Sequence, residues 1–278
     1  MNIKIIKTIA VKDLLEVKQN KSAWITMLVV PLLLVIILPL AFILVPANIS
    51  SSNGMPFTEN EIGLFLDNMP VSFATTFNGL DELQIGIVLL LGYIFAPFFL
   101  IFPLMFSSVI ASESFAGEKE RKTLEALLYT PASDSELFLG KSLAAFIPAV
   151  FITWFSFIIY TLVVNIASFQ FFERIWFPLS SWYPLIFWVT PAMAVLAIAV
   201  TVLISAKTQT FMGAYQTSAS LVIIVLGLLA GQISGILYLD ILTGMIVGSI
   251  FWVISLCLFV ICIRGFNRQK LVQGTNAG

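Results

Sequence analysis

The chain has 278 residues, of which 59% are hydrophobic and only 10% are charged, and its mean hydropathy is +1.03. Soluble domains carry about 25% charged residues, so this composition excludes a soluble enzyme and leaves an integral membrane protein. The net charge of −1 gives no basis for nucleic-acid binding. The chain has no histidine, and Cys257 and Cys262 lie in one apolar run, so we expect neither a metal site nor a disulfide framework.

Six long apolar stretches predict an all-α membrane protein with six transmembrane helices, because a spanning helix needs about 20 apolar residues. The predicted spans are residues 24–46, 84–111, 142–167, 183–206, 214–236 and 241–263. We expect the first span to be retained, since its apolar core is too long for a signal peptide. Whether the short turn between the last two spans re-enters the membrane stays open.

The distribution of basic residues predicts that both termini are cytoplasmic. With this orientation, 13 of the 14 Lys and Arg residues lie on the inner side, and only Arg174 lies outside. Cytoplasmic loops of membrane proteins carry an excess of Lys and Arg, so the reverse topology is excluded.

The chain is expected to divide into three parts. Residues 1–22 form an N-terminal helix, residues 23–264 the six-span domain, and residues 265–278 a short cytoplasmic tail. The domain contains an inner coupling loop at 112–140 and an outer loop at 47–83 whose role stays open.

The N-terminal segment has apolar residues at three- and four-residue spacing, with lysines around them. The apolar positions are Ile3, Ile6, Ala10, Leu14 and Val17. This pattern predicts an amphipathic helix in the cytoplasmic interface of the bilayer, and a short unstructured flank is the alternative.

The predicted spans contain no Asp, Glu, Lys, Arg or His between their boundaries. Ion-coupled transporters and intramembrane hydrolases need such groups, so the sequence offers no catalytic residues and no internal means of energy coupling. If this protein moves a substrate uphill, a partner must supply the energy.

Two features of the spans allow more than one interpretation. The first is a group of aromatic residues and prolines in the second span, which form either the wall of a path for a hydrophobic or amphipathic substrate or an ordinary packing and lipid-facing surface. They are Phe95, Pro97, Phe98, Phe102 and Pro103. Small residues four apart let helices approach closely, so a glycine ladder packs either against a helix of the same chain or against a second copy. The ladder consists of Gly227, Gly231 and Gly235.

The inner loop carries charges and an apolar edge that predict an amphipathic helix across the cytoplasmic mouth. Glu118 and Lys122 are four residues apart, as are Arg121 and Glu125, and Leu124, Leu127 and Leu128 form the apolar edge. Pro131 ends the helix, and Ser133 to Glu136 is a capping box that begins the next one. The helix is either a surface for a partner or a connector that is solvated or lies on the membrane.

The stretch AGEKERKTLEALLYTPASDSELFLGKSLAA, residues 116–145, resembles the signature region of the type-2 ABC exporter permeases, particularly the branch related to sodium-efflux and multidrug permeases. The resemblance implies a prokaryotic cell-membrane protein with a coupling helix that docks on a separate ATP-binding cassette subunit. Its docking residues would be Glu118, Arg121, Lys122, Leu124, Glu125, Leu127 and Leu128. Lys207 and Gln209 resemble the second inner loop of the family more weakly.

The same resemblance implies a complex of two permease copies, here expected as a homodimer, and two ATPase copies. ATP and Mg would bind the partner ATPase, because the Gly-Lys-Ser sequence at 140–142 lacks the first glycine and the preceding strand of a phosphate-binding loop. We therefore expect no cofactor on this chain. The alternative function is a membrane scaffold or signalling subunit that anchors a cytoplasmic partner without transport, and the cargo class stays open among ions, drugs, peptides, lipids and glycans.

Overall fold

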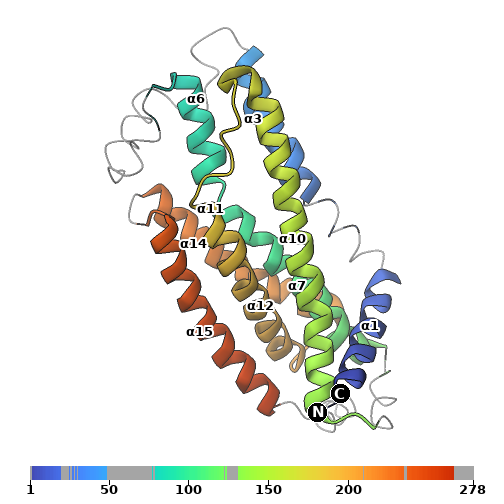
Figure 1. Cartoon of the computed structure of the whole chain (residues 1–278). Helices are drawn as coiled ribbons and strands as arrows, with labels where there is room; N and C mark the ends of the chain where they lie inside the picture. The colour runs from blue at the N-terminus through green and yellow to red at the C-terminus, as the bar shows by residue number, and fades with distance from the viewer. Residues whose placement is uncertain are drawn as a thin grey trace.

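The computed structural model describes residues 2–19, 25, 27, 29, 31–48, 77, 79–121, 123, 131–208, 210–234 and 237–265. Within these residues the chain forms helices and no strands, which confirms the all-α prediction (Figure 1). In chain order the elements are α1 (Ile3–Gln19), η1 (Leu32–Ile37), α3 (Leu38–Asn48), α6 (Glu82–Ile87), η3 (Val88–Ile94), η4 (Pro97–Leu100), α7 (Ile101–Ser112), η5 (Glu113–Gly117), α8 (Glu118–Glu120), α10 (Asp134–Phe172), α11 (Trp182–Pro184), η6 (Leu185–Val189), α12 (Thr190–Ser205), α13 (Phe211–Ser218), η7 (Ala219–Leu221), α14 (Val222–Ile233) and α15 (Ile241–Gly265).

Among the described residues, five helices are long and apolar enough to cross a membrane, so the protein is a multi-pass membrane protein. They are Glu82–Glu120, Asp134–Phe172, Trp182–Ser205, Phe211–Ile233 and Ile241–Gly265. Each contains most of one of the predicted spans two to six. The described part of the first predicted span holds a shorter apolar helix, Leu32–Leu44, and part of that span lies outside the described residues. The total of six spans therefore stays a prediction.

The third span, α10, begins at the predicted capping box. The Ser133 amide donates to Glu136 Oε2 at 3.0 Å, and the Glu136 amide donates to Ser133 Oγ at 3.3 Å. The helix ends at Glu173, which has a left-handed φ of 51°. At 39 residues, α10 is roughly 58 Å long, about twice the thickness of the hydrocarbon core.

The second span is irregular and bends between α6 and α7 (Figure 1). A π-helix, η3, and a 3-10 helix, η4, separate α6 from α7, and a second π-helix, η5, precedes α8 at the end of this span. Pro97 opens η4 and has no amide hydrogen to continue the helical hydrogen bonds, so the break falls where the sequence places a proline.

Helix α12 is the centre of the bundle and contacts α7, α10 and α15. Helix α1 lies along the inner end of α10 (Figure 1). Few residues of α14 and α15 are buried, and both helices are apolar, which suits helices that face lipid. The helix predicted at the N-terminus is present as α1. Its position at a membrane interface stays a prediction.

Candidate functional site

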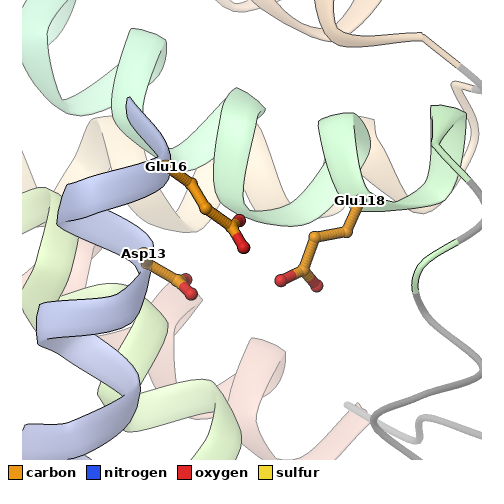
Figure 2. A group of neighbouring side chains, drawn as sticks. All are labelled: Asp13, Glu16 and Glu118. Atoms are coloured by element: carbon orange, nitrogen blue, oxygen red, sulfur yellow. The ribbon is translucent and has the colours of Figure 1, made fainter. Parts of the chain in front are cut away.

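A cluster of charged and polar side chains, most of them buried, lies where α1, the end of the second span at Glu118–Glu120 and the start of α10 meet. We call it the charged junction; it consists of Lys12, Asp13, Glu16, Glu113, Ser114, Glu118, Arg121 and Lys141. Figure 2 shows three of its carboxylates, with Asp13 and Glu16 projecting from α1 toward Glu118 on the second span. The side chains on α1 lie far in sequence from their partners: Lys12 is 106 residues from Glu118, and Asp13 is 128 residues from Lys141.

Lys141 is the innermost cation of the charged junction, with 1% of the residue exposed. Its Nζ lies 2.8 Å from Glu118 Oε2 and 3.3 Å from Asp13 Oδ2, and it donates to the Ser114 carbonyl at 2.7 Å. The Ser114 hydroxyl donates to Asp13 Oδ2. Because a buried charge is costly without a partner, these contacts explain how a lysine and two acids are accommodated together.

Lys12 binds the same acid from the other side. Its Nζ lies 2.6 Å from Glu118 Oε1 and 2.9 Å from Glu16 Oε1. Burial favours the neutral amine, but hydrogen bonds to Glu118 and Glu16 and the charges of Glu118 and Asp13 outweigh it and raise the pKa of Lys12 above its ordinary value. The two carboxylate oxygens of Glu118 are therefore bound by two different lysines.

Three carboxylates of the charged junction lie close enough to suggest a metal site. One oxygen each from Asp13, Glu16 and Glu118 lie within 4.8 Å of one another. Lys12 and Lys141 form ion pairs with these same carboxylates, so ammonium groups of the chain supply the positive charge that a metal would bring. The arrangement is that of a structural ion-pair network.

Arg121 closes the exposed side of the charged junction. Its Nη1 lies 2.5 Å from Glu113 Oε1, and its Nη2 lies 3.6 Å from Glu16 Oε2. Burial acts against the charged form, but the hydrogen bond to Glu113 and the nearby acids raise the pKa of Arg121. The guanidinium therefore joins α1 to the second span as a permanent cation.

The two residues between Glu118 and Arg121 bind the second inner loop. Lys119 Nζ donates to the Thr208 carbonyl at 3.1 Å, just beyond the end of α12, and Glu120 Oε2 accepts from the Phe211 amide at 2.7 Å, at the start of α13. A cation at a helix C-terminus and an anion at a helix N-terminus both complement the helix dipole. Residues 118–121 therefore bind α1 and α10, the end of α12, and the start of α13.

Glu118 is buried in this conformation, and its predicted docking role stays a prediction. The sequence pattern placed Glu118 in an amphipathic loop helix that faces a partner, but Glu118–Glu120 is the last turn of the second-span helix, and the Glu118 side chain is only 1% exposed. The reason is physical: Lys12 and Lys141 bind the carboxylate inside the chain. Arg121 remains partly exposed, with 44% of its side chain accessible.

Most of the other predicted docking residues lie outside the described part of the chain. Lys122, Leu124, Glu125, Leu127 and Leu128 lie outside the described residues, and so does Gln209. Lys207 is exposed beyond the end of α12. Docking through these residues stays a prediction.

The predicted path residues lie mostly inside the helix bundle. Phe95 and Phe102 are 5% and 0% exposed, Pro97 and Pro103 are buried, and Phe98 is partly buried. The Phe102 ring stacks on Phe106 with centroids 6.0 Å apart. In this conformation these residues make the packing core, and a role in a substrate path stays a prediction.

The predicted glycine ladder is not a close helix contact within the described part of the chain. A Cβ added at Gly227 would have no neighbour within 4 Å, and one at Gly231 would lie 3.3 Å from Leu237 Cβ. Gly235 lies outside the described residues. Close packing inside the chain instead uses Gly244 and Gly248, against Pro184 and Trp188.

Sequence reasoning missed Asp13. The residue lies three positions after Ala10 and four before Val17, on the apolar face of α1, and it is 1% exposed. An acid on the apolar face of a helix is the signal that points to a buried cation on a neighbouring helix. Lys141 then provides that cation at the start of the third span.

Comparison with known proteins adds an independent finding. A family model described as ABC-2 family transporter protein matches residues 7–249. The match includes α13, α14, all but the first four residues of α1, and the first nine residues of α15. Searches among curated proteins and among solved structures gave no match.

Proposed function

The chain belongs to the ABC-2 family of transporter proteins, and on this basis we propose that it is the permease subunit of an ATP-driven exporter. Membership makes it the membrane component of an ABC transporter and implies association with an ATP-binding subunit. We further propose that the substrate moves outward along the transmembrane domain and that the loop after Arg121 binds the ATPase subunit. ATP and Mg would bind that partner, and this chain would contribute no catalytic residue.

The observation that supports coupling is the set of contacts made by residues 118–121. These residues include Glu118 and Arg121 of the predicted docking set, directly precede the rest of it, and bind α1, α10, the end of α12 and the start of α13. A displacement of the docking segment would therefore act on four helices at once. Ion pairs and hydrogen bonds of fixed geometry are suited to this role because they resist separation of the helices.

The docking surface itself would have the ordinary anatomy of an interface, with an apolar centre and a charged rim. Leu124, Leu127 and Leu128 would supply the centre. A second permease copy would complete the complex. The uncovered faces of α14 around Gly227 and Gly231 are the proposed contact between the copies, since small residues allow close approach of helices.

Copurification with a candidate ATP-binding cassette subunit tests the docking proposal. The double variant Leu124→Asp, Leu128→Asp should lose binding and stimulation of ATP turnover, because two charges would be buried in an apolar centre. The matched control, Leu124→Ile with Leu128→Ile, keeps the apolar surface and should retain both. Normal binding and stimulation by the Asp variant would show that the docking assignment is wrong.

Transport by reconstituted complexes separates an exporter from a scaffold. Proteoliposomes that contain the permease and its ATPase should move a substrate from a panel of ions, drugs, peptides and lipids only when ATP is present. A complex that forms and hydrolyses ATP, yet moves none of these classes, would favour the scaffold.

A further inference from the structure

The break in the second span changes the hydrogen bonding of three consecutive carbonyls, those of Leu91, Gly92 and Tyr93. In a regular α-helix they would accept from the amides of residues 95, 96 and 97. Here the Phe95 amide donates to the Leu90 carbonyl at 2.8 Å, the Ala96 amide donates to the Tyr93 carbonyl at 3.1 Å, and Pro97 has no amide hydrogen. The segment therefore needs donors from elsewhere in the bundle.

Three side chains from three different helices supply those donors. Tyr160 on α10 donates to the Leu91 carbonyl at 2.8 Å, and Trp182 on α11 donates to the Gly92 carbonyl at 2.7 Å. Gln232 on α14 donates through Nε2 to the Tyr93 carbonyl at 2.8 Å. All three side chains are buried. In a bilayer, where water cannot replace a lost partner, such donors allow a spanning helix to stay broken.

Two of the three donors are fixed in the core. The Tyr160 and Trp182 rings stack on each other with centroids 5.4 Å apart, and both lie against Phe99 and Phe177. Without Tyr160 and Trp182, the Leu91 and Gly92 carbonyls would lose their side-chain partners at a point where the backbone amides bond elsewhere. These two contacts therefore hold the break in a fixed shape.

Gln232 differs from the other two donors in its surroundings. It is one of only two buried residues on α14, the other being Val225, and long apolar side chains of this helix such as Ile223 are mostly exposed. Its Oε1 is buried without a hydrogen-bond partner among the described residues. The Tyr93 carbonyl keeps its bond from the Ala96 amide if Gln232 withdraws. Loss of the Gln232 contact is therefore the least costly of the three.

We propose that the break in the second span is a hinge and that Gln232 is its releasable latch. When the latch opens, α14 separates from η3 and η4, while Tyr160 and Trp182 keep the broken segment in place. All residues of the hinge and the latch lie in this one chain. Its test needs neither the ATPase nor a substrate, so its failure is distinguishable from failure of the proposed function.

Distances between spin labels on α14 and α10 test the latch in the purified full chain in lipid nanodiscs. Labels are placed by Ser234→Cys and Ile166→Cys, both at exposed positions, in a background with Cys257→Ser and Cys262→Ser. Gln232→Leu and Gln232→Met both remove the donor, and Met keeps the length of the side chain. Each should raise the ratio of long to short distances by about threefold, the effect of one average hydrogen bond in a membrane protein.

Tyr160→Phe is the matched control, because it also removes one buried donor to a carbonyl of the break and keeps the ring. Because Gln232 still binds the Tyr93 carbonyl and the ring of residue 160 still stacks on Trp182, this variant should leave the distance between the labels unchanged. An unchanged distribution in the folded Gln232 variants would overturn the latch. An equal lengthening in Tyr160→Phe would overturn it as well, since opening would then not depend on Gln232.

Discussion

At the scale of single residues, the charged junction is a balance between desolvation and pairing. Lys141 and Asp13 are almost fully buried, and Glu118 lies between Lys141 and Lys12. Buried ion pairs add little net stability compared with apolar packing, but removing one partner leaves an uncompensated charge. The junction is therefore better understood as fixing the relative position of three helices than as a source of stability.

Replacing Lys141 with Met should be strongly destabilising, because Asp13 and Glu118 would remain buried with one cation fewer. We expect a loss of about 3–5 kcal/mol in the free energy of unfolding. Denaturant unfolding in detergent, followed by tryptophan fluorescence, measures it. Lys207→Met, at an exposed lysine, is the control and should change stability by at most about 0.5 kcal/mol. Equal effects of the two variants would contradict the buried charge network.

The raised pKa of Lys12 predicts that α1 stays docked in alkaline solution. A group whose pKa is higher in the folded state stabilises it fully below the unfolded pKa, here 10.5, and loses that contribution only as the pH rises through the higher folded value. Limited proteolysis of α1 should therefore proceed equally at pH 7 and pH 9, after correction for protease activity. Faster cleavage of α1 at pH 9 in the unmodified chain would contradict this assignment, whereas Lys12→Met should speed cleavage at both values.

At the scale of elements, the contact of α1 with α10 depends on a residue without a side chain. A Cβ added at Gly140 would lie 2.8 Å from both Cβ and Cγ2 of Ile9 and 3.1 Å from the Ile6 carbonyl. Ile6 and Val17 of the predicted apolar stripe are buried, but Ile9 lies outside that stripe, so the face that packs is wider than the face that periodicity predicts. The close approach brings Asp13 within reach of Lys141.

Gly140→Ala should push α1 away from α10 and destabilise the protein by about 1–3 kcal/mol, because the new methyl group meets a β-branched side chain and backbone. Gly227→Ala is the control, since its added Cβ meets nothing within 4 Å and Ala has the higher helix propensity. Unfolding midpoints and hydrogen exchange of α1 measure both variants. A destabilisation by Gly227→Ala equal to that of Gly140→Ala would argue against the close contact.

The elements themselves were largely predictable, and their irregularities were not. Apolar length places five spans, and the Ser133–Glu136 pattern places the start of α10, because both signals are local in sequence. The π-helix η3 has no such signal: its broken hydrogen bonds depend on Trp182 and Gln232, which are 90 and 139 residues from the carbonyls that they bind. Pro97 marks the position of the break but not its partners.

At the scale of the whole molecule, the charged junction could be predicted only in part, because its contacts join residues that are far apart in sequence. The signature around Glu118 predicts which part of the chain is functional, but the contact of Lys12 with Glu118 spans 106 residues and that of Lys141 with Asp13 spans 128. No local pattern pairs residues so far apart. Their contact follows from the packing of α1 on α10, which the sequence alone does not determine.

Lys119 and Glu120 offer a test of coupling across the whole molecule. Lys119→Met with Glu120→Gln removes the side-chain contacts to the second inner loop and leaves Glu118 and Arg121 in place. We expect the ATPase still to copurify, because the predicted docking segment is unchanged, while substrate moved per ATP falls. The unmodified complex, assayed in parallel in proteoliposomes, gives the reference. Unchanged transport per ATP would show that these contacts do not carry the coupling.

The length of α10 has a mechanical consequence. From Lys141 in the charged junction to Phe172 near its other end, the helix extends roughly 46 Å at 1.5 Å per residue. For a rod of that length, a tilt of about 5° at the junction displaces the far end by about 4 Å. A sub-ångström adjustment among ion pairs on one side of the protein is thus converted, by leverage alone, into a shift as large as an atomic diameter on the other.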